Sequence, residues 1–373
     1  MVLNERNGGI TMPTAAIWGA GSIAHTHAEA LRACGIPIAA VVSRRESAAG
    51  EFAARWGITR FGTDPAILFE DGIDCIHICT PPNLHYEMAL ECLNRGKHVL
   101  CEKPLCMEDD QARHLARVAR QKQLVCAVNF NVRFHTACRE ARNKVQSPDF
   151  GRVLLIHGNY LQEFGALPAP MDWRYDPRLA GRMHAVTEIG THWMDIAQCI
   201  SGKRISAVSA QFGNFWPVRY LEGGMMHADT APGRSPVTVS GEDAAIISLR
   251  FEDGAIGVVT LSEVSQGRYN HLSLEITGEK QSIWWNSEQS NLLNFACRGG
   301  TVQSHVFAFA GGFPDTFRAL MAAVYQDVAN GAPGSDPEYP TFRDGMYSVL
   351  LCNAIFESAS HNSVWISLPE QED

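Results

Sequence analysis

The 373-residue sequence has no long apolar run and no excess of basic residues. No stretch reaches the roughly 20 apolar residues that a membrane-spanning helix requires. Lysine and arginine number 31 against 40 aspartates and glutamates, giving a formal net charge of −9. Non-specific binding of nucleic acid needs a basic surface, so this balance argues against it. We therefore expect neither a membrane nor a nucleic acid as a partner.

Paired cysteine motifs are also missing. The eleven cysteines form no Cys-x-x-Cys pair, and their odd number argues against a disulfide framework or a zinc site. We expect buried free thiols, no bound metal and a reducing, cytoplasmic location. Residues 1–12 are polar and lack the apolar core of a signal peptide, which predicts a disordered extension.

The pattern of apolar residues predicts two domains of different fold class. Over residues 13–132, short apolar strands alternate with amphipathic helices, which predicts a Rossmann domain with a doubly wound parallel sheet. Over residues 133–373 the strands are longer and pair around turn residues such as Asp253 and Gly254. The second part is therefore predicted to be an α+β domain with a largely antiparallel open sheet, closed by a helix over residues 342–360.

A glycine-rich turn follows the first predicted strand. Residues 19–24 read G-x-G-x-x-A between a strand and a helix, the context that nucleotide binding requires. Gly19 permits the tight turn, and Gly21 lets the backbone approach a pyrophosphate at the helix start. We expect Gly19, Gly21, Ser22 and Ile23 to bind a dinucleotide; a glycine turn without a ligand is the alternative.

The second strand ends without the acidic residue that usually bonds the ribose of NAD. Ser43 and Arg44 stand there instead, followed by Arg45. A serine hydroxyl and a guanidinium suit a 2′-phosphate, so the sequence favours NADP(H), with NAD(H) possible. The alternative is that Ser43 caps the next helix while the arginines are solvated.

Two further turns follow predicted core strands. Residues 80–83 read Thr-Pro-Pro-Asn with His85 close behind, and such a rigid turn can wall a nicotinamide ribose. Glu102, Lys103 and Pro104 follow the next strand, where the proline restrains the lysine backbone. Ligands of open α/β sheets lie at the carboxyl ends of strands, which makes Lys103 a catalytic candidate. A plain surface turn is the alternative.

A second chemical block lies in the predicted α+β domain. Trp173 and Arg174 precede Glu188, His192 and Asp195, which are spaced i, i+4 and i+7 and would share one face of a helix. A carboxylate and an imidazole so placed can carry protons or bind a metal. A solvated helix face with a packed histidine is the alternative.

In this order and spacing, the four blocks resemble the Gfo/Idh/MocA oxidoreductases, which include glucose–fructose oxidoreductase and inositol dehydrogenases. The resemblance spans nearly the whole chain and implies a substrate cleft between a Rossmann domain and a C-terminal sheet domain. Lys103 matches the lysine of the family's Glu-Lys-Pro motif, and His192 matches its acid/base histidine. Glu188 stands where the family usually has aspartate.

The resemblance implies hydride transfer between a nicotinamide cofactor and a secondary hydroxyl or ketone of a sugar, inositol or related polyol. The alternatives are a glycosidase that uses bound NAD transiently and a non-catalytic ligand-sensing regulator. The expected catalytic residues are Lys103 and His192. The substrate-binding or orienting candidates are Glu188, Asp195, Trp173, Arg174, Arg133 and Tyr160. Further cofactor-binding candidates are Thr80, Pro81, Asn83, His85, Glu102 and Lys103.

Three expectations concern surfaces. Strands between Ile246 and Trp285 carry apolar residues on both alternations, which predicts an open sheet face covered by a second copy in a homodimer or homotetramer. A loop or the closing helix covering that face is the alternative. Residues 216–236 are long enough for a lid. Arg182 adds charge before Glu188 and points either to an acidic or modified sugar or to an altered loop.

Overall fold

The computed structural model describes residues 12–309 and 311–369, which form two compact units. The first unit contains the chain up to Phe134 together with Phe313–Val349. The second contains His135–Gly312 and the chain from Leu350. The predicted disordered extension lies, apart from Met12, outside the described residues.

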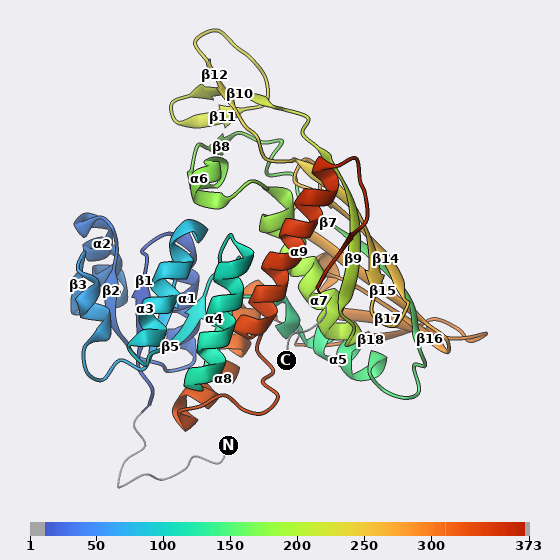
Figure 1. Ribbon diagram of the computed structural model, residues 1–373, viewed down its shortest axis with the longest axis horizontal. Helices are drawn as coiled ribbons and strands as arrows, with labels where there is room; N and C mark the ends of the chain where they lie inside the picture. The colour runs from blue at the N-terminus through green and yellow to red at the C-terminus, as the bar shows by residue number, and fades with distance from the viewer. Residues whose placement is uncertain (1–11, 310, 370–373) are drawn as a thin grey trace. The chain divides into compact units, whose positions relative to one another are not determined.

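A six-stranded parallel sheet forms the centre of the first unit (Figure 1), in the order β3-β2-β1-β4-β5-β6. Every neighbouring pair is parallel, which confirms the predicted doubly wound sheet. Strands β1, β4, β5 and β6 are buried along their whole length, as expected for a sheet covered on both faces. Their bounds are Ala15–Trp18 (β1), Ile38–Val42 (β2), Arg60–Gly62 (β3), Cys75–Ile78 (β4), His98–Cys101 (β5) and Cys126–Val128 (β6).

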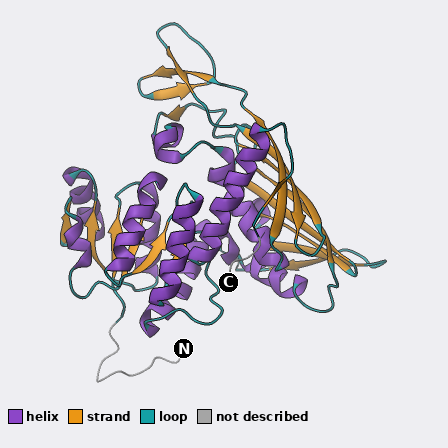
Figure 2. Ribbon diagram, viewed as in Figure 1, coloured by secondary structure: helices purple, strands orange, loops and turns teal. Residues whose placement is uncertain are grey.

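Helices connect the strands of this sheet, and Figure 2 shows them in purple beside it. One predicted helix, over residues 64–70, is instead a short 3-10 helix, Pro65–Phe69. Asp64 caps it by accepting the N–H of Ala66, and the backbone is already extended at Glu70, so no room remains for an α-helix. The other helices are Ser22–Ala33 (α1), Glu46–Trp56 (α2), His85–Asn94 (α3) and Asp109–Lys122 (α4).

Helix α8, Phe313–Asn330, completes the core of the first unit although it comes late in the chain. Its apolar face, including Phe317 and Val324, packs in one buried cluster with Ala24 and Leu31 of α1. The sequence pattern predicts no helix there, and residues 133–373 were expected to form one domain. The compact units divide differently, because the packing of α8 against α1 places residues 313–349 in the first unit.

A nine-stranded sheet dominates the second unit, in the order β18-β17-β16-β15-β7-β14-β13-β9-β19. Only the pairing of β7 with β14 is parallel within this described sheet, which confirms a largely antiparallel sheet. The strands are Val153–Leu161 (β7), Ile205–Gly213 (β9), Ala244–Phe251 (β13), Ile256–Ser262 (β14), His271–Gly278 (β15), Gln281–Asn286 (β16), Leu292–Cys297 (β17), Gln303–Val306 (β18) and Ile366–Ser367 (β19). The helices of this unit are Thr136–Val145 (α5), Pro177–Ala180 (α6) and Thr191–Ser201 (α7), and the closing helix Phe342–Ser360 (α9) contributes to both units.

The segment expected as a lid folds largely into a small four-stranded sheet, ordered β12-β10-β11-β8. Arg219 in this sheet is 2% exposed; it donates to Asp243 Oδ1 at 2.8 Å and to the carbonyl of Gly165. A buried ion pair of this kind fixes the sheet to the chain around it. The strands are Ala169–Pro170 (β8), Val218–Glu222 (β10), Met225–His227 (β11) and Ser235–Thr238 (β12).

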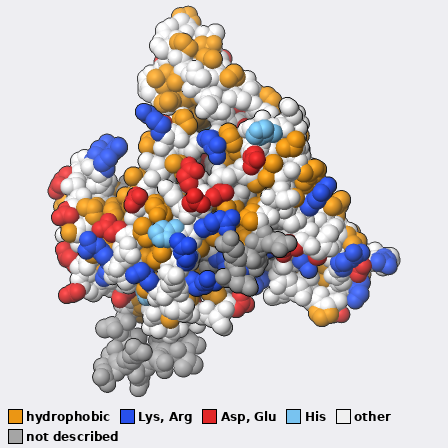
Figure 3. Space-filling model, viewed as in Figure 1, with side chains coloured by type: hydrophobic (Ala, Val, Ile, Leu, Met, Phe, Trp, Pro, Cys, Tyr) orange, Lys and Arg blue, Asp and Glu red, His pale blue; other side chains and the backbone are white. Residues whose placement is uncertain are grey.

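The surface carries both signs of charge. Figure 3 shows basic and acidic side chains interspersed on the face in view. Among the described residues, no helix is both long and apolar enough to cross a membrane.

Candidate active site

Three turns leave the carboxyl edge of the six-stranded sheet side by side. They follow β1, β4 and β5, whose last residues Trp18, Ile78 and Cys101 are in register. The backbone joins the turns directly: Cys79 N–H donates to Trp18 O at 2.8 Å, and Glu102 N–H donates to Ile78 O at 2.9 Å. The glycine turn, the Thr-Pro-Pro turn and the Glu-Lys-Pro turn therefore share one edge, where open α/β sheets bind ligands.

The glycine turn has the geometry of a phosphate cradle. Gly19 has φ +115°, and a Cβ there would lie 2.5 Å from the carbonyl oxygen of Cys79, so only glycine fits. A Cβ at Gly21 would meet nothing within 4 Å, which leaves this backbone open to an approaching ligand. Helix α1 then begins at Ser22 with no side-chain cap and no acid in its first turn. Its free N–H groups suit the pyrophosphate of a dinucleotide.

The end of β2 presents Ser43 and two arginines. Ser43 N–H donates to Gly62 O at 3.1 Å, and Arg44 and Arg45 are exposed. Helix α2 begins at Glu46 with Arg45 as its N-cap and without a side-chain cap. Ser43 therefore does not cap this helix, contrary to the alternative raised above.

His85 lies between two of the turns and holds them together. Its Nδ1 is 2.7 Å from the carbonyl oxygen of Pro104, and its Nε2 is 2.8 Å from that of Thr80. Burial lowers the pKa of His85, although both carbonyl contacts act in the opposite direction. The ring thus contacts both the proline turn and the Glu-Lys-Pro turn, and in its neutral form it donates a hydrogen bond to one of the two carbonyls. Nearby, the buried Asn83 Oδ1 has no hydrogen-bond partner within the described chain.

Glu102 anchors the turn that carries Lys103. The carboxylate is buried; it lies 2.8 Å from His27 Nε2 and accepts from Asn129 Nδ2 at 2.5 Å. Its second oxygen accepts the backbone N–H of Lys103 at 3.3 Å. The Lys103–Pro104 peptide bond is cis, and the Lys103 side chain is partly exposed. The residue before the lysine and the one after it are thus both held by buried contacts.

The charge of Glu102 is stabilised inside the protein. Burial by itself raises the pKa of Glu102. The contacts with His27 and the hydrogen bond from Asn129 lower it by a larger amount, so the pKa lies below its usual value. Neither His27 nor Asn129 was predicted from the sequence to take part in the site. Only the position of His27 on a helix after the glycine turn hinted at a polar group facing the sheet.

In the second unit, Glu188 lies in a π-helical turn, Val186–Gly190, that runs into α7. Such turns are rare and often occur at functional sites. His192 and Asp195 follow in α7, where Asp195 is buried and His192 is partly exposed. The three side chains therefore differ in their access to solvent, which the spacing alone did not predict.

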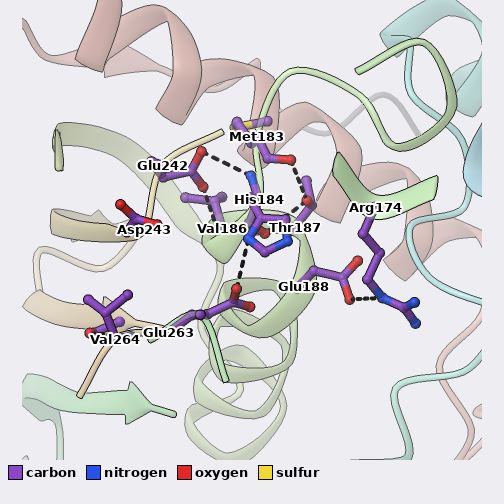
Figure 4. Close-up of polar contacts among 12 residues, drawn as sticks. Arg174, Met183, His184, Val186, Thr187, Glu188, Glu242, Asp243, Glu263 and Val264 are labelled. Carbon is purple, nitrogen blue, oxygen red and sulfur yellow. Dashed lines mark hydrogen bonds and ion pairs between the residues drawn. The ribbon is translucent and has the colours of Figure 1, made fainter. Parts of the chain in front are cut away.

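Arg174 contacts Glu188, and Figure 4 shows the two side chains facing each other. Arg174 Nε lies 3.3 Å from Glu188 Oε2, and Arg174 Nη1 lies 2.8 Å from Asp172 Oδ2. The guanidinium also lies over the Trp173 ring, 4.5 Å from its centroid. The structure thus brings together three of the predicted substrate-binding residues.

One turn before Glu188, His184 forms an ion pair with Glu263 that was not predicted from the sequence (Figure 4). His184 Nδ1 is 2.7 Å from Glu263 Oε2, and the ring stacks on Tyr175 at 4.9 Å. Glu242 accepts the backbone N–H groups of His184 at 2.9 Å and of Val186 at 2.7 Å. These contacts hold the start of the π-helical turn from two directions.

Burial and charge shift the pKa values of this cluster. Burial lowers the pKa of His184, but the charge and hydrogen bond of Glu263, with Glu188 and Glu242 nearby, raise it to about 9. His184 is therefore a cation at neutral pH. Burial raises the pKa of Glu242 to about 7, although the N–H groups of Val186 and His184 oppose this rise. Glu242 and Glu263 lie far from His184 in the sequence, so no local pattern predicted these contacts.

Comparison with family models decides the family. Residues 14–130 match the model described as the oxidoreductase family with an NAD-binding Rossmann fold. Residues 138–284 match the GFO/IDH/MocA C-terminal domain. The chain belongs to the Gfo/Idh/MocA oxidoreductases. The resemblance drawn from the sequence motifs is thereby confirmed.

Two relatives of this Gfo/Idh/MocA oxidoreductase are named as dehydrogenases of levoglucosan and of myo-inositol. Levoglucosan dehydrogenase of Pseudarthrobacter phenanthrenivorans is 30% identical over 362 residues, covering 90% of each chain. Myo-inositol 2-dehydrogenase of Thermotoga maritima is 24% identical over 336 residues, covering 89% of this chain and 92% of the relative. Among solved structures, levoglucosan dehydrogenase in complex with NADH and L-sorbose is 27% identical with a TM-score of 0.87, covering 96% of this chain and 99% of that one.

Three other residues named from the sequence of this family member have structural partners. Tyr160 is buried and donates to Asn270 Oδ1 at 2.7 Å, and burial raises its pKa. Arg133 pairs with Asp344 at 3.2 Å. The Arg182 guanidinium lies over the Phe356 ring at 4.2 Å. Each of these contacts lies within a single unit.

Within the described part of this oxidoreductase, no group of three or more His, Cys, Asp and Glu side chains is placed to hold a metal ion.

Proposed function

We propose that this oxidoreductase transfers a hydride between a nicotinamide cofactor and a secondary hydroxyl or ketone of a sugar, inositol or related polyol. The observation that carries the proposal is the shared edge of the parallel sheet, where the Gly19 cradle, the Thr80 turn and the Lys103 turn are hydrogen-bonded neighbours. A phosphate cradle and a positioned lysine on one edge match the needs of a dinucleotide-dependent dehydrogenase. The names of the relatives agree with this class.

Two residues carry the proton chemistry in this proposal. The bound nicotinamide would supply the acceptor or donor of the hydride. The imidazole of His192 takes up or returns the proton of the reacting hydroxyl, as histidine side chains do in general acid–base catalysis. The ammonium of Lys103 donates a hydrogen bond to the reacting oxygen and stabilises its developing negative charge. Glu188, Arg174 and Trp173 bind and orient the remaining hydroxyls.

We propose NADP(H) as the preferred cofactor, with NAD(H) also accepted. The support is the pair Ser43 and Arg44 at the end of β2, where the sequence offers a hydroxyl and an exposed cation and no carboxylate. The relative described above was solved with NADH, so the preference is a property to be measured for this chain. Titration of nicotinamide fluorescence with NADPH and NADH tests it; tighter binding of NADH contradicts the proposal.

The substrate is proposed to be neutral. Around Arg174 and the cationic His184 lie three carboxylates, Asp172, Glu188 and Glu263, together with Glu242, whose pKa of about 7 leaves it only partly charged at neutral pH. This acidic surplus disfavours a sugar acid. Arg182, the residue that suggested an acidic sugar, instead covers the Phe356 ring in the same unit.

The two alternative functions predict different assay results. A glycosidase that uses bound NAD transiently would cleave a glycoside without net change in added NAD(P)H, and a regulator would bind a sugar without turnover. The relatives named above are dehydrogenases, which supports the proposed hydride transfer over the two alternatives. Incubation with levoglucosan, myo-inositol and L-sorbose and each oxidised or reduced cofactor, read at 340 nm, tests it. No absorbance change with any of these probes contradicts the proposal.

A second copy of the chain is the proposed partner. On one face of the nine-stranded sheet, Ile246 is 52% exposed, Ile256 58% and Val258 37%. Neighbouring apolar side chains on an open sheet are a common interface. We propose a homodimer or homotetramer through this face.

A cytoplasmic location is proposed because all eleven cysteines are free thiols.

A further inference from the structure

A chain of polar side chains crosses the core of the first unit, from the Glu-Lys-Pro turn to α8. His27 Nε2 lies 2.8 Å from Glu102 Oε1, and His27 Nδ1 lies 2.9 Å from His77 Nδ1. His77 Nε2 in turn lies 2.9 Å from the hydroxyl of Tyr325. Both histidines are fully buried, and Tyr325 is 5% exposed. The proposed function assigns no role to His27, His77 or Tyr325.

His27, His77 and Tyr325 each come from a different element, so the packing of these elements fixes the polar chain of side chains. His27 belongs to α1, His77 to β4 and Tyr325 to α8. The His27 ring also packs edge-on against Phe317 of α8, with 5.7 Å between the ring centroids. The surroundings are apolar, including Ala24, Ala28 and Leu31 of α1. Apolar side chains in these places would fill the core without polar burial, so stability alone does not account for the chain.

The protons of the chain are ordered by its acidic end. Burial, the largest cause, holds the pKa of His77 well below its usual value, so His77 is neutral. When His27 donates its Nε2–H to the Glu102 carboxylate, its Nδ1 accepts the Nδ1–H of His77. The Nε2 of His77 then accepts the hydroxyl proton of Tyr325. Each hydrogen bond selects the tautomer of the next ring.

We propose that His27, supported by His77 and Tyr325, is a positioning residue for Lys103. The chain fixes the His27 ring as a donor to Glu102. Glu102 in turn holds the backbone N–H of Lys103 and places a negative charge beside its side chain. This inference rests on the proposed role of Lys103. Lys103 thus depends on groups that touch neither substrate nor cofactor.

A pair of substitutions separates the donor from the rest of the ring. In His27→Gln, the amide N–H takes the place of Nε2–H and keeps the donor to Glu102. In His27→Asn, the shorter amide takes the place of Nδ1 and loses that donor. We expect kcat to fall roughly 10- to 100-fold in His27→Asn, as for loss of a hydrogen bond to a charged group, and to recover to within about fivefold in His27→Gln. Binding of NAD(P)H should be unchanged in both.

His98→Gln is the matched control. His98 is also a buried histidine of the first unit, in β5, but its Nδ1 accepts the backbone N–H of Val125 and it takes no part in the polar chain from Glu102 to Tyr325. We expect kcat of His98→Gln to stay near the wild-type value. Melting temperatures of all variants show whether each one folds. Should His27→Asn fail to fold, Glu102→Gln carries the same expectation, because it keeps the shape of the side chain and removes its charge.

The background variant Lys103→Ala distinguishes positioning from a general structural role. If His27 acts through Lys103, then His27→Asn causes no further loss of kcat in Lys103→Ala. A folded His27→Asn with wild-type kcat overturns the inference, and so does an equal loss in both backgrounds. Full turnover by Lys103→Ala itself overturns the proposed role of Lys103. That result differs from the two results that overturn the role of His27, so the two failures can be distinguished.

Discussion

The pair formed by His184 and Glu263 makes the stability of the second unit depend on pH in a direction that can be derived. The folded pKa of His184 is about 9, raised from 6.5. A group whose pKa is raised on folding stabilises the fold below its unfolded pKa and loses that contribution as pH rises through the folded value. The two values differ enough to contribute about 3 kcal/mol at pH 6.5, which disappears by about pH 9.5.

Substitution Glu263→Gln removes the charge that holds this proton. The side chains are only 12% and 8% exposed, so the surrounding water screens the pair weakly. We expect Glu263→Gln to lower the free energy of unfolding by about 3 kcal/mol more at pH 6.5 than at pH 9.5. The comparison between the two pH values cancels effects of the amide that do not depend on the proton.

Urea denaturation followed by tryptophan fluorescence measures the effect, with wild type and variant compared at both pH values. Glu288→Gln is the matched control, because Glu288 lies 2.8 Å from His271 Nδ1 in a more exposed pair. That control should change by less than about 1 kcal/mol between the two pH values. Equal destabilisation by Glu263→Gln at pH 6.5 and pH 9.5 would refute the assignment of His184 as a buried cation.

Three further predictions test other parts of the molecule. Lys103→Ala should lower kcat by roughly 10²- to 10⁴-fold while NAD(P)H affinity, read by fluorescence, stays within about threefold; unchanged turnover contradicts its catalytic role. Gly19→Ala should weaken cofactor binding and destabilise the protein by about 2 kcal/mol or more, because the added methyl meets the Cys79 carbonyl; a melting temperature equal to wild type would contradict this. Val258→Glu should shift the mass in light scattering toward the monomer, since it places a charge on the exposed sheet face; an unchanged mass excludes this face as the interface.

Local patterns predicted much of the fold. The strand Ala244–Phe251 and the helix Phe342–Ser360 have the bounds expected from the sequence, because alternation and helical periodicity are strong there. The glycine turn at residues 19–24 was also identified, since its spacing is dictated by the shape of a phosphate. In each case the information lies within a few residues of chain.

Features that depend on distant residues were not predicted. The pairing of His184 with Glu263, and of His27 with Glu102, arises only when separate elements pack together. The placement of α8 in the first unit likewise depends on its packing against α1 and not on its own pattern. The π-helical turn at Glu188 has no signature in the residue spacing, which an ordinary helix satisfies equally well.

The buried pair of Arg219 and Asp243 has a consequence for engineering. The small sheet β12-β10-β11-β8 presents short strands and turns that invite exchange with the corresponding segment of a relative. Arg219 lies in β10, whereas Asp243 directly precedes β13, where the chain re-enters the large sheet. Both side chains are nearly inaccessible to water. A graft that replaces one without the other leaves a solitary charge in the interior, at a cost of about 3–5 kcal/mol. Segments for exchange should therefore begin before Arg219 and end after Asp243.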